Sequence, residues 1–165
     1  MRKKTKKQAT YAFVDSQNLN LGVRSQGWKL DFKRFRKFIK DKYQVSKAFL
    51  FIGFIPGNET LYKELAGYGF ELIFKPTVKD KRKKVKGNVD ADLVLHTMLQ
   101  YKNYSKAVIV SGDGDFYCLI EYLESKNKLK KIIVPNKKYS SLLRKFRKYI
   151  VRVGDFRSKV QKERD

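Results

Sequence analysis

The chain has a single cysteine, Cys118, and a single histidine, His96, among its 165 residues. One cysteine excludes an internal disulfide framework and a cysteine-rich zinc site, and one histidine leaves too few of the usual nitrogen ligands for zinc. No run approaches the roughly 20 apolar residues that span a bilayer. The basic, polar first ten residues are not followed by the apolar run of a secretory signal. We therefore expect a cytoplasmic protein with no membrane segment.

Acidic residues are also scarce: 16 Asp and Glu stand against 39 Lys and Arg, so the formal net charge is +23. So basic a domain needs polyanions nearby, with nucleic acid as the leading partner and an anionic membrane surface as the second. A genome of biased base composition, which inflates lysine at neutral surface positions, is the alternative explanation. Hydrophobic residues make up 42% of the chain, which is enough for a core and excludes disorder of the whole chain.

Apolar segments alternate with amphipathic segments along the chain. This pattern predicts a three-layer α/β/α sandwich with a central, mainly parallel sheet. We expect strands at 11–14, 48–55, 70–74, 107–110, 131–134 and 150–151, and helices at 31–42, 58–66, 89–101, 116–125 and 140–149. The predicted domain spans residues 10–153, after a disordered basic arm at 1–9 and before a basic tail at 154–165 that frays beyond Asp155. The charge run at 79–87 is predicted to be a mobile loop.

Helical spacing also assigns side chains to the core or to solvent. Asp31 is a candidate N-cap for the first of the predicted helices. Arg36 falls on the basic, solvated face of that helix. Met98 is expected to face inward and Cys118 to lie in the core. Phe116 is predicted to be a core residue in preference to a stacking platform for a base.

Five of the ten aspartates fall where the predicted strands end or where the helix before one of them begins. They are Asp15, Asp90, Asp92, Asp113 and Asp115. Because the carboxyl ends of parallel strands face one crevice, we expect these carboxylates to converge. Like charges raise each other's pKa, and a hard divalent cation removes that cost, so oxygen-only ligands point to Mg²⁺ or Mn²⁺. Simple N-caps and tight turns are the alternative for each residue alone.

Three segments taken together resemble the signature of NYN domains, which belong to the PIN-like nuclease superfamily. They are residues 14–18 (VDSQN), 86–90 (KGNVD) and 110–116 (VSGDGDF). The resemblance covers about residues 10–153 and implies a PIN-like, Rossmann-like sandwich with the activity of a metal-dependent endoribonuclease. It implies that Asp15, Asp90, Asp113 and Asp115 are the catalytic and metal-binding residues.

The resemblance also implies residues that contact substrate or support the acids. Asn18 is expected to position a phosphate or a carboxylate, and Ser111 to orient the Asp113 turn, both counted with the substrate-binding residues. Many family members carry a further Asp near the position of His96, and Asp92, one turn earlier on the same helical face, is the candidate replacement. We therefore expect Asp92 and His96 to support the metal ligands. Phosphate contacts are expected from five basic residues before Asp90, namely Lys81, Arg82, Lys83, Lys84 and Lys86.

The expected chemistry is hydrolysis of RNA phosphodiester bonds by one or two Mg²⁺ or Mn²⁺ ions that neutralise the phosphate and activate water. Backbone contacts from lysine imply weak base specificity. An aspartyl phosphatase is disfavoured, because it needs a second Asp two residues after the first, where this chain has Gln17. A non-catalytic RNA-binding or regulatory module is the alternative, since one fold serves several functions. The RNA target, the cleavage polarity and the oligomeric state, including a homodimer, stay open.

Overall fold

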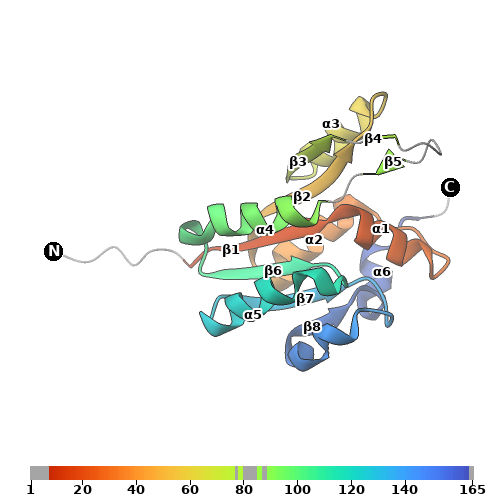
Figure 1. Cartoon of the computed structure of the whole chain (residues 1–165). Coiled ribbons are helices and arrows are strands. Elements are labelled where there is room, and N and C mark those ends of the chain that lie inside the picture. The colour runs from red at the N-terminus through yellow and green to blue at the C-terminus, as the bar shows by residue number, and fades with distance from the viewer. Residues whose placement is uncertain (1–7, 77, 80–84, 87–88, 164–165) are drawn as a thin grey trace.

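Six parallel strands form the central sheet of the structure, a computed structural model that describes residues 8–76, 78–79, 85–86 and 89–163. The strand order is β3-β2-β1-β6-β7-β8 (Figure 1). The strands are β1 (Thr10–Asp15), β2 (Val45–Phe54), β3 (Phe70–Pro76), β6 (Lys106–Val110), β7 (Leu129–Val134) and β8 (Ile150–Arg152). All five strand pairings within this sheet are parallel, so every strand ends at the same edge.

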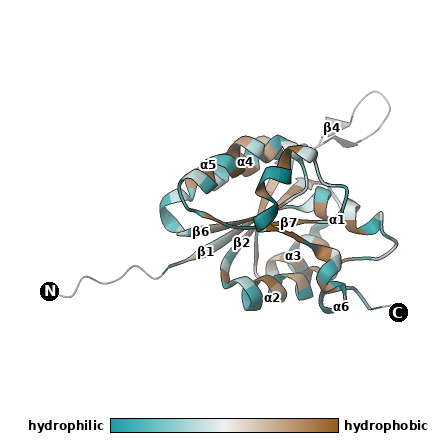
Figure 2. Ribbon diagram, turned by 90° about the horizontal axis from the view of Figure 1, so that it is seen from below, coloured by the Kyte–Doolittle hydropathy of each residue, from teal (hydrophilic) through white to brown (hydrophobic). Residues whose placement is uncertain are grey.

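Helices cover both faces of the sheet, as Figure 2 shows for α4 and α5 on one side and α2 and α3 on the other. One layer holds α1 (Ser16–Arg24), α2 (Phe32–Tyr43), α3 (Glu59–Gly67) and α6 (Arg157–Val160). The other holds α4 (Asp90–Leu99), α5 (Tyr117–Ser125) and the 3-10 helix η3 (Ser141–Tyr149). Short 3-10 turns lie at η1 (Tyr101–Asn103), η2 (Gly114–Phe116) and η4 (Val153–Phe156). The predicted α/β/α sandwich is confirmed.

Successive side chains of a strand point to opposite faces of the sheet and so contribute to two separate cores. In β1, Ala12 and Val14 pack with the α1 and α2 layer, while Tyr11 and Phe13 pack with the α4 and α5 layer. Because both faces are covered, a central strand such as β6 is apolar throughout its buried part instead of alternating with polar residues. Among the described residues, no helix is both long and apolar enough to cross a membrane.

Several boundaries differ from the predictions. β2 begins at Val45, three residues before the predicted start, because the polar residues at its beginning hide the strand pattern. The segment predicted as a helix at 140–149 is a 3-10 helix interrupted at Phe146, whose backbone is not helical. At the predicted mobile loop of residues 79–87, β4 (Val78–Lys79), which begins one residue earlier, pairs with β5 (Val85–Lys86) as a short antiparallel ladder, while residues 80–84 and 87–88 lie outside the described residues. Strands of two residues within a run of charged residues are too short to give a periodic hydrophobic pattern in the sequence.

Arg36 was assigned to the solvated face of its helix, and this prediction was wrong. Its side chain is only 8% exposed. The guanidinium group donates hydrogen bonds to the carbonyl oxygens of Gly69 at 3.2 Å, Val45 at 3.3 Å and Ser46 at 3.3 Å. Helical spacing could not reveal this, because the acceptors lie outside the helix, at the start of β2 and in the turn before β3. Asp31, by contrast, caps α2 as predicted, accepting from the amides of Lys33 and Arg34.

Two further assignments to the core were wrong. Met98 is 38% exposed, and the thiol-bearing Cys118 is exposed as well. Both lie on helices of the same layer, whose inward faces are already filled by residues such as Leu93 and Leu119. Phe116 is fully buried, as predicted.

The C-terminal residues are folded, so the prediction that the chain frays beyond Asp155 was wrong. Phe156 and Val160 are buried, and the Phe156 ring stacks on Phe38 with centroids 4.1 Å apart. The amide of Asp31 donates to the carbonyl of Val160 at 2.8 Å. The frequent charged residues of this segment obscure its apolar pattern in the sequence. The division of the chain into arm, domain and tail stays a prediction.

Gly22 provides a stability test of the packing between α1 and the end of β7. A Cβ atom at this position would lie 2.5 Å from the Cβ and Cγ of Pro135, whose ring is rigid. Gly22→Ala is therefore expected to destabilise the protein by about 1–3 kcal/mol, the usual cost of overpacking.

Gly67 is the matched control, because it ends α3 with nothing within 4 Å of an added Cβ. Gly67→Ala is expected to leave stability unchanged or raise it by up to about 1 kcal/mol through helix propensity. Urea unfolding of both variants measures the difference. Equal midpoints would contradict the close approach of α1 to Pro135.

Candidate metal centre

The strand order reverses direction between β1 and β6, and the candidate site lies at the carboxyl ends of these two strands. β1 continues toward β2 and β3, while β6 continues toward β7 and β8 on the other side. Asp15 is the last residue of β1, and the turn Ser111–Asp115 follows directly after β6. Such a reversal opens a crevice at the carboxyl edge of a parallel sheet, which is where ligands bind in this class of fold.

Three carboxylates meet in this crevice. Asp90 is the first residue of α4, Asp113 caps η2, and Asp115 lies within η2. One carboxylate oxygen from each lies within 4.8 Å of the others. Asp90 and Asp113 are half-buried and Asp115 is exposed. A group of acids at this spacing could hold a metal ion.

The turn after β6 is held in shape by its own side chains. The amide of Asp115 donates to Oδ1 of Asp113 at 2.9 Å. The amide of Asp113 donates to the hydroxyl oxygen of Ser111 at 3.1 Å. These bonds fix the backbone that carries two of the three carboxylates, those of Asp113 and Asp115.

Asp15 lies beside this cluster and is 4% exposed. Its Oδ1 accepts from the amide of Asn18 at 3.2 Å, and its Oδ2 accepts from the hydroxyl of Ser111 at 3.3 Å. Burial raises the pKa of Asp15; the two hydrogen bonds lower it in part, and the charge of Asp113 raises it further. Asp15 is not one of the three acids whose oxygens lie together, although all four were predicted as one set.

Asn18 of α1 and Ser111 connect the turn to the segment that contains Asp15. Oδ1 of Asn18 accepts from the amide of Gly112 at 2.9 Å. Ser111 is 1% exposed and connects Asp15 to the backbone of Asp113. These contacts agree with the expected orientation of the turn by Ser111, while its place among the substrate-binding residues stays a prediction.

The pKa of Asp90 is raised to about 7. Burial is the largest cause, followed by the charge of Asp113, the hydrogen bond with Asp115 and the charge of Asp15. At neutral pH the cluster therefore favours uptake of a proton or of a cation.

Two predicted supporting residues lie outside the group. Asp92 is paired with Lys75 of β3, its carboxylate oxygen 3.5 Å from Nζ. The His96 ring lies against Phe51, with centroids 5.6 Å apart. Neither belongs to the acidic group found among the described residues. Asp92 and His96 contact β3 and β2, so the side of α4 that they share is directed toward these two strands.

The predicted phosphate contacts are only partly covered by the structure. Lys81, Arg82, Lys83 and Lys84 lie outside the described residues. Lys86 is the second residue of β5, shortly before Asp90 in the chain. Their role in binding phosphate stays a prediction.

Sequence reasoning missed how closely the chain packs against the two glycines of the turn. A Cβ at Gly114 would lie 2.4 Å from Oγ of Ser140, and one at Gly112 would lie 3.1 Å from Cβ of Tyr139. The amide of Ser140 also donates to the carbonyl of Gly112 at 3.0 Å. Two glycines flanking Asp113 were the available signal, because glycine permits close backbone approach.

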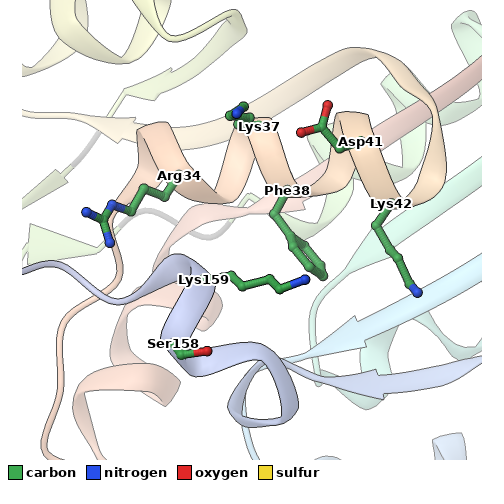
Figure 3. A pocket seen from close by; sticks show the side chains of 7 residues that line it. All are labelled: Arg34, Lys37, Phe38, Asp41, Lys42, Ser158 and Lys159. Atoms are coloured by element: carbon green, nitrogen blue, oxygen red, sulfur yellow. The ribbon is translucent and has the colours of Figure 1, made fainter.

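A cavity of about 590 Å³ lies between α2 and α6, on the sheet face opposite α4 and α5 (Figure 3). Its lining is mixed in charge and consists of Arg34, Lys37, Phe38, Asp41, Lys42, Ser158 and Lys159. Arg34 is already engaged by Asp31 and Glu163. This cavity is therefore separate from the carboxylate site.

Comparisons with known proteins agree with this architecture. The family model of the NYN domain matches residues 9–153. The low amplitude and bright protein LabA of Synechococcus elongatus is 22% identical over 160 residues, which cover 91% of this chain and 86% of the relative. A crystal structure of a Vibrio parahaemolyticus protein of unknown function has a TM-score of 0.76 at 22% identity and covers 98% of this chain and 100% of its own. At this identity the solved structure supports the fold alone.

Proposed function

The chain belongs to the NYN domain family, and from this premise we propose that it is a metal-dependent endoribonuclease that hydrolyses phosphodiester bonds in RNA. The observation that carries the proposal is the meeting of Asp90, Asp113 and Asp115 within 4.8 Å at the crevice where the strand order reverses. Family membership alone would leave activity open, because a fold can be retained without its chemistry. The three converging carboxylates give the chemical reason to expect catalysis.

The residues present fit a hard divalent ion. Ligands of one Mg²⁺ lie 2.0–2.1 Å from it, so two of them are at most about 4.2 Å apart. Oxygens within 4.8 Å need only small side-chain rotations to reach this spacing. The donors are all carboxylates, which favour Mg²⁺ or Mn²⁺ over zinc. In this proposal Asp90, Asp113 and Asp115 hold the ion, and Asp15 supports them from its buried position.

The ion would supply charge neutralisation at the scissile phosphate and a lowered pKa for the attacking water. The chain supplies position. Ser111 and Asn18 hold the turn so that Asp113 and Asp115 face the same point. Asp115, the exposed member, orients the water by accepting a hydrogen bond at a carboxylate oxygen. Asp15 adds negative charge that strengthens cation binding.

RNA is the proposed substrate for two reasons. The net charge of +23 favours a polyanion, and binding through lysine-rich contacts reads the backbone instead of the bases. NYN domains bind RNA in general, which favours RNA over DNA here. We expect weak dependence of cleavage on base sequence.

The direct test is incubation of the full chain with end-labelled single-stranded RNA in Mn²⁺ or Mg²⁺, with EDTA as the control. Cleavage that requires the metal is the expected result. Binding of the RNA without cleavage in either metal would contradict the proposal and favour the non-catalytic RNA-binding module.

A further inference from the structure

A basic pocket of about 280 Å³ lies at the carboxyl ends of β7 and β8. Its lining residues are Lys137, Tyr139, Arg147, Ile150 and Arg152. Arg152 ends β8 and is in register with Val134, which ends β7. Because all strands of the sheet are parallel, the pocket lies at the same edge as the carboxylate site.

The pocket has an excess of positive charge. Three of its five lining residues are cations, and none is an acid. Arg152 has a partner, Asp155, at 3.5 Å. Within the described part of the chain, the side chains of Lys137 and Arg147 make no hydrogen bond or ion pair. Converging guanidinium and ammonium groups in a concave surface suit a phosphate, which accepts several charge-assisted hydrogen bonds.

The pocket is joined to the acidic turn by direct packing. Tyr139 in its wall approaches Gly112 so closely that an added Cβ there would lie 3.1 Å from Cβ of Tyr139. Gly112 immediately precedes Asp113. The ends of β6 and β8 are two strand spacings apart, roughly 10 Å. A nucleic acid strand whose scissile phosphate lies at the carboxylates therefore has another phosphate within reach of the pocket.

We propose that this pocket binds a second phosphate group of the RNA and so fixes the strand across the crevice. The proposal rests on the proposed function, because it describes the substrate of the same site. Lys137 and Arg147 donate to the phosphate oxygens, together with Arg152. Tyr139 and Ile150 provide apolar surface for the attached sugar. The phosphate comes either from the interior of the strand or from its end, and the two sources share this chemistry.

The test compares two variants that lose the same charge from the same two segments. Lys137→Ser with Arg147→Ser removes the two cations that line the pocket and lack partners among the described residues. Lys138→Ser with Arg144→Ser removes a neighbouring lysine and arginine that do not line it. Binding of 3′-labelled single-stranded RNA is measured by anisotropy in EDTA, over a series of salt concentrations. Melting curves of both variants verify folding, which these exposed positions are expected to leave intact.

The pocket variant is expected to bind about tenfold more weakly than the control variant, as for loss of a charged hydrogen bond. Its salt slope is expected to be shallower by about 0.7, the value for one phosphate of a single strand. A 5′-phosphorylated and a 5′-hydroxyl RNA distinguish the sources. If only the former shows the difference, the pocket binds a terminal phosphate; if both do, it binds an internal one.

If the two variants bind RNA with equal affinity and equal salt slopes, the proposal that the pocket binds phosphate is refuted, even if the wild type cleaves RNA. Conversely, if the two variants differ in RNA binding but the wild type does not cleave RNA with either metal, the phosphate pocket is supported and the nuclease activity is refuted. The two proposals therefore fail separately.

Discussion

Asp113→Asn is expected to reduce metal-dependent RNA cleavage by about a thousandfold or more, equivalent to about 4 kcal/mol of transition-state stabilisation. The reason is loss of one of the three carboxylates that meet at the crevice. The amide that replaces the carboxylate retains an oxygen to accept from the backbone of Asp115. The conformation of the turn is therefore preserved, while the negative charge of residue 113 is lost. Asp15→Asn is also expected to reduce cleavage, because it removes the buried negative charge beside the three acids.

Initial rates of RNA cleavage at saturating Mn²⁺ measure this effect. Asp41→Asn is the matched control: it makes the same chemical change on α2, across the sheet from α4 and α5. It is expected to cleave RNA at the wild-type rate. Far-UV spectra of all variants should coincide. An Asp113→Asn protein that still cleaves at the wild-type rate, or cleavage that persists in EDTA, would refute a metal site at these acids.

The metal-free protein is expected to become less stable as the pH rises from 5 to 8. The pKa of Asp90 is raised from 3.8 to about 7 in the folded protein. A carboxyl with a raised pKa binds its proton more tightly when folded, so its stabilising effect is complete below the unfolded pKa and is lost as the pH rises through the folded pKa. Allowing for solvent screening, the free energy of unfolding should fall by about 1–2 kcal/mol.

Addition of Mn²⁺ or Mg²⁺ should reverse this loss. A ligand that binds only the folded state stabilises it by about 2.7 kcal/mol at a hundredfold excess over Kd. Asp113→Asn should raise the melting temperature of the metal-free protein at pH 8, because one of the negative charges that, together with burial, raise the pKa of Asp90 is gone. The same variant should lose most of the metal-induced shift.

Melting curves of both proteins at pH 5 and pH 8, each with and without Mn²⁺, separate this result from its alternative. If the aspartates serve only as caps and turn formers, Asp113→Asn lowers the melting temperature or leaves it unchanged, and metal has little effect. A wild type indifferent to Mn²⁺, with a variant no more stable, would contradict the shared site.

The strand ends were the most predictable part of the site. Asp15 directly follows one continuous apolar run and Asp113 lies three residues after another, and the residues that follow such runs lie at the sheet edge. The separation between buried Asp15 and the other three acids was not predictable. Asp15 accepts a hydrogen bond from Ser111, which follows the neighbouring strand β6, and a contact between segments 96 residues apart leaves no local pattern in the sequence.

The basic side chains were the least predictable part. The same helical pattern that located α2 assigned Arg36 to solvent, yet three carbonyl groups from other segments hold it inside. The basic pocket at the ends of β7 and β8 also takes its cations from a loop, a 3-10 helix and a strand. Lysine and arginine are so frequent in this chain that composition cannot distinguish a binding residue from a solvated one.

The folded C-terminal segment also constrains how the chain acquires its structure. Arg34 of α2 donates to the carbonyl of Gln161, 127 residues away, and Leu30 forms an isolated bridge with the same residue. Contacts of such long sequence separation raise the contact order and slow folding. During synthesis, the outer surface of α2 stays uncovered until residues 156–161 have emerged. The layer that α1 and α2 form is therefore completed only by the segment around α6, and a nascent protein in which that segment has not yet emerged exposes Phe38 and Leu30 to other chains.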